Sequence, residues 1–435
     1  MSEATAALRP ARLPRAPAGI VRGATLGASR LAGVAAQMGV QIAVGTLGGA
    51  AGIGTLQVHM AWGTLLGEVV GAGEPTRAMR DTAVNGARSV RTNLLRASRR
   101  IAAFALLPLA VVTIYFLLAA IPSKDTSFAL LLSVVVAAPL FALGRLFAET
   151  LKSLGGTLAA VTFENTALPL VILLGCAGAA LGFYSLDSEA ILVSAVAGTL
   201  ACFLLLAHSL ARHLKAAAKS KRGPAENVTT SSTEQLNFWL TGLLNIAFLQ
   251  LPFLLLPWLV GAEDVGRYAV AHKLVNIITT LLILIAAVYG PRFARSVRSD
   301  IDLARRQLRE TQHISLALFA PAWVAMLMLT GFWETLFSVG HGTLGTLLLI
   351  LGLGQLVNAA TGLSGVLLTM GGAAHLETRL LLATIAGVTA TAIPLGSIYG
   401  ATGVASAAAS GMALRNLAGY ALAQRHLLKI KEQQA

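Results

Sequence analysis

The stretch LLNIAFLQLPFLLLPWLVGAEDVGRYAVAHKLVNIITTLLILIAAVYGPRFAR, residues 243–295, holds two apolar runs separated by one short turn. The runs fall within residues 236–258 and 266–289. Each is long enough to cross a membrane, because about 20 apolar residues in a helix span the hydrocarbon layer. The turn is acidic, and the second run ends in Pro-Arg. This pattern predicts a transmembrane helical hairpin.

The rest of the chain repeats the apolar pattern. Its 435 residues are 56% hydrophobic and 12% charged, with a mean hydropathy of +0.73, whereas soluble domains have about 25% charged residues. So few charged side chains cannot cover a water-facing protein of this size, and lipid must surround much of its surface. The length criterion predicts about twelve spans. They lie at residues 24–44, 51–73, 101–120, 127–147, 157–183, 190–210, 236–258, 266–289, 314–333, 344–368, 378–398 and 402–423.

The basic residues follow these spans in a regular way. The formal net charge is +14, and most of the 33 Lys and Arg residues fall before the first span or on alternate loops after it. The opposite loops hold Lys124 and Arg267. Because basic segments stay on the cytoplasmic side during insertion, we predict a multi-pass protein of the bacterial inner membrane with both termini cytoplasmic. The charge then needs no nucleic-acid partner to explain it.

A short repeat divides the chain into halves. The hexamers GAAGIG, Gly49–Gly54, and GAEDVG, Gly261–Gly266, each lie between the two spans of a hairpin. Each hairpin then ends in a proline followed by arginines, at Pro75 and Pro291. With an even number of spans per half, both halves insert with the same orientation and enclose a cavity. We therefore predict an all-α membrane protein with two pseudo-symmetric six-helix lobes around a central cavity.

The predicted domain boundaries follow from the spans and from one polar stretch. Residues 211–235 carry Lys, Arg, Gly-Pro and a Ser/Thr run, which is typical of a cytoplasmic linker. The lobes are then residues 24–210 and 236–424. Residues 1–23 are expected to be a disordered cytoplasmic tail, without the apolar core of a signal peptide, and residues 425–435 a second tail.

Motifs for nucleotide or metal chemistry are absent from the sequence. It has no phosphate-binding Gly-x-x-x-x-Gly-Lys-Ser/Thr loop and no HExxH or paired-cysteine spacing. Cys176 and Cys202 fall inside predicted spans, where apolar packing explains them. A membrane polymerase or ligase would need a substantial external loop, and these loops are short. We therefore expect a protein that is not an enzyme and uses no metal or cofactor.

Ionisable residues inside the spans are the remaining candidates, because each is costly in lipid and usually faces a cavity. Arg30, Arg415 and Lys273 would supply positive charge from both halves, which suits a phosphate group that crosses the membrane. His272 and His59 occupy nearly equivalent places in the two halves. We assign these five residues to substrate binding in the cavity. The stem of Lys273 is also long enough to reach the outer interface instead.

Two further polar residues, Glu164 and Asn165 in the fifth span, are candidates for binding a coupling proton or sodium ion. Structural alternatives stay open for several of these assignments. A hydrogen bond or ion pair would equally explain Glu164 and Asn165, and packing would explain His59. Arg30 would either reach the lipid headgroups or pair with Glu68.

The quoted stretch resembles the start of the second half of polysaccharide flippases in the multidrug/oligosaccharidyl-lipid/polysaccharide (MOP) exporter superfamily. The shared features are a span, a glycine-containing turn ending in tyrosine, and a second span ending in proline. They correspond to Gly261, Ala262, Gly266, Arg267, Tyr268 and Pro291. The first hairpin and two later runs are similar to the family as well, at Gly52, Gly54, Trp62, Pro75, Arg80, Gly354, Gln355, Asn358, Gly362, Gly371, Gly400, Gly403 and Ala405.

The resemblance implies a MATE-like bundle that moves an oligosaccharide linked to polyprenyl pyrophosphate from the cytoplasmic to the outer leaflet by alternating access. The product would serve a surface polysaccharide such as exopolysaccharide, O-antigen or capsule. Implied partners are membrane lipid, a polysaccharide polymerase and export machinery. Gln250 stands where the family often has an acidic residue. The alternative is a cation-coupled multidrug exporter of the same superfamily, which would bring acidic residues into the cavity.

Overall fold

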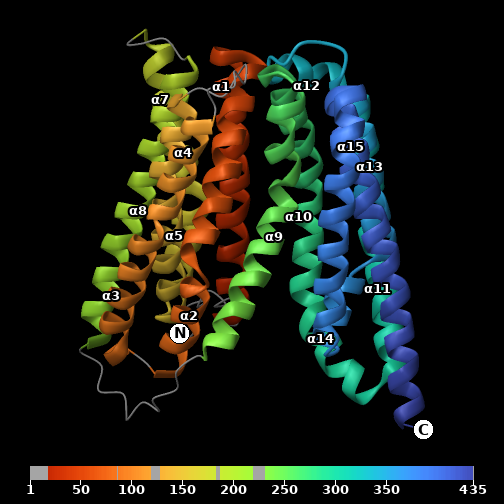
Figure 1. Cartoon of the computed structure of the whole chain (residues 1–435). Coiled ribbons are helices and arrows are strands. Elements are labelled where there is room, and N and C mark those ends of the chain that lie inside the picture. Colours follow the sequence, from red (N-terminus) through yellow and green to blue (C-terminus); the bar gives the residue numbers. More distant parts are fainter. Residues whose placement is uncertain (1–17, 86, 119–127, 183–186, 219–230, 435) are drawn as a thin grey trace, which may run out of the picture.

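The computed structural model describes residues 18–85, 87–118, 128–182, 187–218 and 231–434 (Figure 1). Within them the chain is helical and has no strand. The elements are α1 (Ala18–Gly71), α2 (Glu74–Asn85), α3 (Ala87–Phe104), α4 (Leu106–Leu118), α5 (Phe128–Ser153), α6 (Thr157–Thr162), the π-helix η1 (Phe163–Ala167), α7 (Leu168–Ala180), α8 (Ser188–Ala218), α9 (Ser232–Leu259), α10 (Ala262–Ser299), α11 (Ile301–Met328), α12 (Thr330–Leu336), α13 (Leu344–Thr361), α14 (Ser364–Met370) and α15 (Ala374–Gln434).

Eight helical stretches of the described chain are long and apolar enough to cross a membrane, judged by length and composition. They lie in α1, α5, α6 to α7, α8, α9, α11, α13 and α15. α1 and α15 each contain one residue with non-helical backbone angles, so each consists of two consecutive helices. Each of these helices accounts for one span. Two predicted spans remain. The described part of 101–120 lies on α3 and α4, and 266–289 lies on α10. The expectation of about twelve spans is thereby confirmed.

The breaks inside α1 and α15 fall at glycines. Gly49 has a φ of 64° and Gly400 a φ of 61°, in the left-handed region that glycine adopts without strain. α1 and α15 each reverse direction, and both reversals lie at the same end of the bundle (Figure 1). We name this the glycine end. The opposite, basic end carries the described chain ends, α2, α3 and the junction of α10 with α11.

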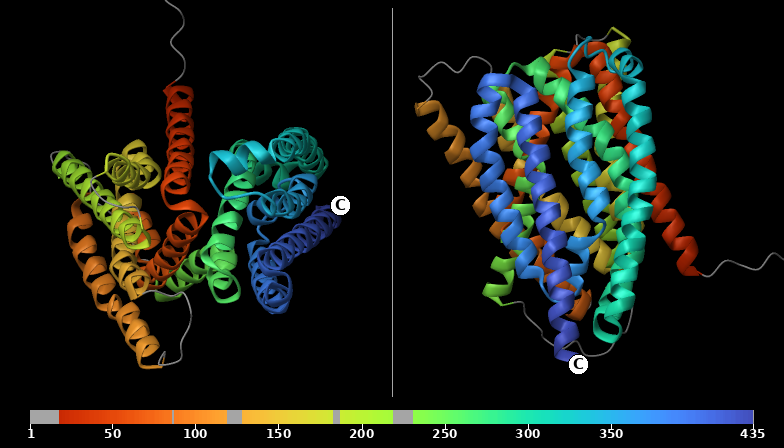
Figure 2. Two further views of the ribbon diagram at one scale, coloured as in Figure 1. Left: turned by 90° about the horizontal axis from the view of Figure 1, so that it is seen from above. Right: turned by 90° about the vertical axis from the view of Figure 1, so that its right-hand side faces the viewer.

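The helices form two groups (Figure 2). α2 to α8 pack with one another and around α1, whereas α9 to α15 pack mainly with one another. We name these groups the N-lobe (α1 to α8) and the C-lobe (α9 to α15). The lobes meet along a seam in which α1 contacts α9 and α10, and α2 contacts α9.

The two glycine hexamers of the sequence meet in this seam. A Cβ placed on Gly54 would lie 2.2 Å from the carbonyl oxygen of Ala262, and one on Gly266 would lie 1.8 Å from that of Ala50. Contacts this short leave no room for a side chain, and small residues let membrane helices approach through their backbones. The repeat therefore supplies both sides of the lobe contact at the glycine end.

Three clusters of buried apolar residues show how the seam changes along the membrane normal. The largest cluster joins both lobes toward the glycine end and includes Val44 of α1 and Phe337, which follows α12. Toward the basic end, the N-lobe has its own cluster around Leu146 and the C-lobe another around Phe293. The lobes thus share a core at one end and have separate cores at the other.

The described helices extend into the predicted tails and linker. Residues 18–23, expected to be disordered, belong to α1, and residues 425–434 continue α15. α8 and α9 both extend into the predicted linker. Residues 1–17 and 219–230 lie outside the described part of the chain.

Candidate functional site

A polar cavity of about 310 Å³ lies in the seam between the lobes. α1 lines it from the N-lobe, and α9 and α10 line it from the C-lobe. We name it the central cavity. Its polar lining residues are Gln37, Gln41, Gln57, Gln250, His272, Lys273, Asn276 and Thr280. Carboxamides and one ammonium group dominate this set, and no carboxylate is among the described residues that line the cavity.

Helical spacing and one cross-lobe contact organise this lining. Lys273, Asn276 and Thr280 follow one another at intervals of three and four residues on α10, so they share a helix face. The Nζ of Lys273 donates a hydrogen bond to Oε1 of Gln37 on α1. The Oε1 of Gln41, one turn further along α1, is buried without a hydrogen-bond partner among the described residues. A buried acceptor of this kind calls for a donor from water or a ligand.

His272 lies between the central cavity and the apolar core that both lobes share. The side-chain amide of Asn276 donates to the imidazole, with 3.1 Å between Nδ2 and Nδ1. The ring lies parallel to that of Tyr268, with centroids 6.0 Å apart, and edge-on to Phe253 at 5.1 Å. Lys273 and His272 therefore both lie at the central cavity, while substrate binding by them stays a prediction.

Arg30 lies beyond the central cavity, on the face of α1 that leads into it. It precedes Val34 and Gln37 by four and seven residues, so the three share one helix face. Its side chain is exposed and has no ion-pair partner among the described residues. The pairing with Glu68 is wrong, because Glu68 pairs with Arg145.

Arg415 is balanced within the C-lobe. It forms an ion pair with Glu377, on the part of α15 that precedes the turn at Gly400. The guanidinium also lies 5.0 Å from the ring centroid of Phe248. Arg415 is not among the residues that line the central cavity.

His59 is fully buried between α1 and α5. Its Nδ1 lies 2.8 Å from the Oγ of Ser133. It does not line the central cavity, and its Nε2 is buried without a hydrogen-bond partner among the described residues, so substrate binding and packing both stay predictions.

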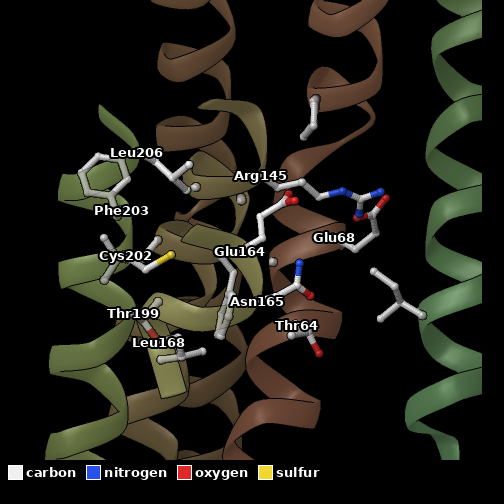
Figure 3. Close-up of a pocket in the computed structure, with 17 residues that line it drawn as sticks. Thr64, Glu68, Arg145, Glu164, Asn165, Leu168, Thr199, Cys202, Phe203 and Leu206 are labelled. Carbon is white, nitrogen blue, oxygen red and sulfur yellow. The ribbon is translucent and has the colours of Figure 1, made fainter. Parts of the chain in front are cut away.

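A second cavity of about 310 Å³ lies in the N-lobe (Figure 3). Ile246 of α9 lines it from the C-lobe. We name it the N-lobe pocket. Glu164 and Asn165 both line it. The Oε2 of Glu164 lies 2.9 Å from Nζ of Lys152, and the Asn165 side-chain amide donates to the carbonyl of Val161 at 2.7 Å. Glu164 is thus ion-paired, and Asn165 is hydrogen-bonded to the preceding helical turn.

The same two residues lie in the π-helix η1, and π-helical turns are frequent at functional sites. The Sγ of Cys202 donates to the carbonyl of Phe163, the first residue of η1, at 3.2 Å. On the other side, a Cβ on Gly33 would lie 2.7 Å from the Cβ of Asn165. α1 therefore packs directly against the π-helix through a glycine.

Two groups of residues were missed from the sequence. Glu68, which is 7% exposed, was considered only as a partner for Arg30, yet its carboxylate points toward Arg145 in the N-lobe pocket (Figure 3). Gln37, Gln41 and Gln57 of the central cavity were missed because carboxamides carry no charge. The spacing of Gln37 and Gln41, one helical turn apart in an apolar span, is the signal that would have found them.

Comparison with known proteins supports this architecture. Residues 25–297, more than half of the chain, match the family described as polysaccharide biosynthesis protein. No curated protein matches the chain.

The chain is similar in fold to solved structures of transporters. An inward-facing multidrug resistance MATE family transporter of the MOP superfamily has a TM-score of 0.68 at 12% identity, covering 94% of this chain and 96% of that one. The lipid II flippase MurJ, in an inward closed conformation, has a TM-score of 0.58 at 14% identity, with coverages of 94% and 90%. At these identities the likeness shows the fold, and it confirms the expected MATE-like bundle. The chain therefore belongs to the polysaccharide biosynthesis protein family and has the fold of MOP-superfamily transporters.

Proposed function

We propose that the protein is a flippase that moves an oligosaccharide linked to polyprenyl pyrophosphate from the cytoplasmic to the outer leaflet, for the biosynthesis of a surface polysaccharide. The family and the fold support transport of a lipid-linked substrate. The observation that carries the choice of substrate is the lining of the central cavity, which combines carboxamides with an ammonium group and no described carboxylate.

The carboxamides suit a sugar. Each one offers both hydrogen-bond donors and an acceptor, which is what the hydroxyl groups of a sugar require. They come from both lobes, with Gln57 on α1 and Gln250 on α9. The unpartnered oxygen of Gln41 is ready to accept from a hydroxyl. The cavity volume of about 310 Å³ also falls in the range of small-molecule sites, about 300–1,000 Å³.

The positive charge suits the pyrophosphate. Lys273 donates to the neutral Gln37 and has no ion-pair partner among the described residues. An ammonium group that is not neutralised by a carboxylate can form charge-assisted hydrogen bonds with phosphate oxygens. Arg30, exposed on the same face of α1, would meet the pyrophosphate before it reaches Lys273.

A cation-coupled multidrug exporter is less well supported. A cationic drug is stabilised by opposite charge in its cavity, and the described lining offers Lys273 in place of an acid. Glu164 and Glu68 belong to the separate N-lobe pocket, where each already has a basic partner.

The apolar cores support entry from the basic end. The shared core holds the lobes together toward the glycine end, while their cores are separate toward the basic end. With the basic end in the cytoplasm, as its arginines favour, the central cavity receives substrate from the cytoplasmic leaflet. Rocking of the lobes would then open it outward, where a polymerase and export machinery take the product. The N-lobe pocket, with Glu164 and Asn165, is the candidate place for a coupling ion.

Translocation in proteoliposomes tests the proposal. We expect wild-type protein to translocate a fluorescent lipid-linked oligosaccharide and Lys273→Met to do so at least about tenfold more slowly, because a charged hydrogen bond contributes about 1.5–3 kcal/mol. Lys431→Met is the matched control, since Lys431 pairs with Asp302 at an exposed site. Translocation of a cationic dye without translocation of the oligosaccharide would favour the multidrug exporter instead.

A further inference from the structure

Glu68 touches both lobes near the basic end. Its carboxylate pairs with Arg145 of α5 in the N-lobe. From the C-lobe, a Cβ on Gly242 of α9 would lie 2.2 Å from Oε1 of Glu68. The Nε1 of Trp239, also on α9, donates to the backbone carbonyl of Glu68 at 3.1 Å. α9 therefore packs against both the carboxylate and the backbone of this residue.

The same face of α9 makes further contacts with the N-lobe toward the start of the helix. Gln235 precedes Trp239 by one turn, and its Nε2 donates to Oε1 of Glu74 at 3.0 Å. It also donates to a backbone carbonyl in the turn between α1 and α2 at 3.0 Å. We name the contacts of Gln235, Trp239 and Gly242 with residues 68–77 the basic-end latch.

The ionisable groups that face Glu68 come from four elements. Arg145 from α5, Glu164 from η1 with its partner Lys152, and Cys202 from α8 share the N-lobe pocket with Glu68. Glu74 from α2, with its partners Arg77 and Arg100, lies next to it in the latch. The residues of α9 nearest to Glu68, namely Trp239, Gly242 and Ile246, carry no charge. At the start of α9, Glu234 pairs with Arg80 of α2 at 2.9 Å, where both side chains are exposed. Glu164 and Glu74 are thus already paired with other cations, and Glu68 is the described carboxylate that pairs with Arg145.

This arrangement suits a proton better than a metal ion. Arg145 already takes the place that a cation would occupy beside Glu68. The described residues also contain no group of three His, Cys, Asp or Glu side chains arranged to hold a metal. A proton needs only one carboxylate oxygen. The N-lobe pocket, at about 310 Å³, has room for water at about 30 Å³ per molecule, and water delivers protons.

We propose that Glu68 is a proton-binding site that controls the basic-end latch, an inference that rests on the proposed transport function. When a proton adds to Glu68, the neutral acid no longer compensates Arg145, and an unpaired charge in a partly buried seam is unfavourable. The side chains must then rearrange toward water. The carboxyl group has no free space beside Gly242, so its movement displaces α9. Proton binding therefore loosens the latch, and proton release closes it.

Distances between spin labels test this proposal without substrate. Labels on the exposed residues Thr92 of α3 and Asn237 of α9 would be measured in nanodiscs by pulsed electron paramagnetic resonance, with both native cysteines replaced by serine. We expect the wild-type distance to lengthen on acidification. Glu68→Gln should give the long distance in acidic and alkaline buffer alike, and Glu234→Gln, which removes the exposed pair with Arg80, should keep the pH dependence. A distance in Glu68→Gln that still followed pH would overturn the proposal.

A second variant opens the latch by packing alone. Gly242→Ala places a methyl group against Oε1 of Glu68 and keeps the carboxylate. We expect it to show the long distance in alkaline buffer. Gly387→Ala is its control, because a Cβ there meets nothing within 4 Å, and it should match the wild type. An unchanged distance in Gly242→Ala would also count against the latch. These distances are measured without substrate. They can therefore contradict the latch while oligosaccharide translocation is observed, or support the latch while translocation is absent.

Discussion

Gly266 of the C-lobe lies so close to Ala50 of the N-lobe that a Cβ on Gly266 would be 1.8 Å from the Ala50 carbonyl oxygen. The backbones of α10 and of the second half of α1 therefore touch with no side chain between them. This contact belongs to the glycine end, where the lobes share one apolar core. Any movement that opens the seam at this end must separate these two backbones.

Gly266→Ala should weaken the seam at the glycine end. The added methyl group has no space, and overpacking typically costs about 1–3 kcal/mol. We expect a lower Tm in detergent and slower translocation, because the lobes cannot close fully. Gly261→Ala is the matched control in the same hexamer, since a Cβ there meets nothing within 4 Å. Equal Tm values for the two variants would show that the backbones are not in contact.

Gly33→Ala should disturb the π-helix, because its methyl group would collide with the Cβ of Asn165. The displaced π-helix would break the hydrogen bond from Cys202 to the carbonyl of Phe163. We therefore expect Cys202 to react faster with a maleimide in this variant, measured by mass spectrometry of the labelled peptide. Gly27→Ala on the same helix meets nothing within 4 Å and should leave the labelling rate unchanged. The prediction fails if both variants label at the wild-type rate.

The spans and the lobe contact were predictable because they depend on short patterns. Runs of apolar residues fix the membrane segments whatever their neighbours are. The hexamers Gly49–Gly54 and Gly261–Gly266 mark both a helix reversal and the place where the lobes meet, since close backbone contact requires small residues at fixed positions. The helix at residues 18–23 was missed, because a run that is too short to span the membrane gives no length signal, although it can still continue the adjacent helix.

The polar site was only partly predictable, for a different physical reason. Lys273 and Arg30 stand out because charge is costly in lipid, whereas Gln37 and Gln41 are uncharged and do not. The partner of a charged residue depends on how the helices pack, because packing decides which helix surfaces come into contact. Glu68 and Arg145 are separated by 77 residues, and no spacing rule relates them.

Gln41→Leu should reduce transport without loss of stability. The Oε1 of Gln41 is buried and unpartnered among the described residues, and replacing a buried polar group that lacks a partner by an apolar one of similar shape is close to neutral or stabilising. If this oxygen accepts from a sugar hydroxyl, the variant should translocate oligosaccharide more slowly at an unchanged or raised Tm. Thermal unfolding and translocation measured on the same preparation decide this. Wild-type translocation would remove Gln41 from the site.

Arg415→Ala should destabilise the C-lobe, because it leaves Glu377 without its cation. The two side chains are 20% and 22% exposed, so the cost should fall below the 3–5 kcal/mol of a fully buried pair, at about 1–3 kcal/mol. Removing both charges avoids most of this cost, so Arg415→Ala combined with Glu377→Ala should recover both Tm and translocation. The comparison separates a structural role from a role in binding pyrophosphate. A double variant that regained its Tm but still failed to translocate would assign Arg415 to the substrate, and a double variant that regained both would assign it to the ion pair.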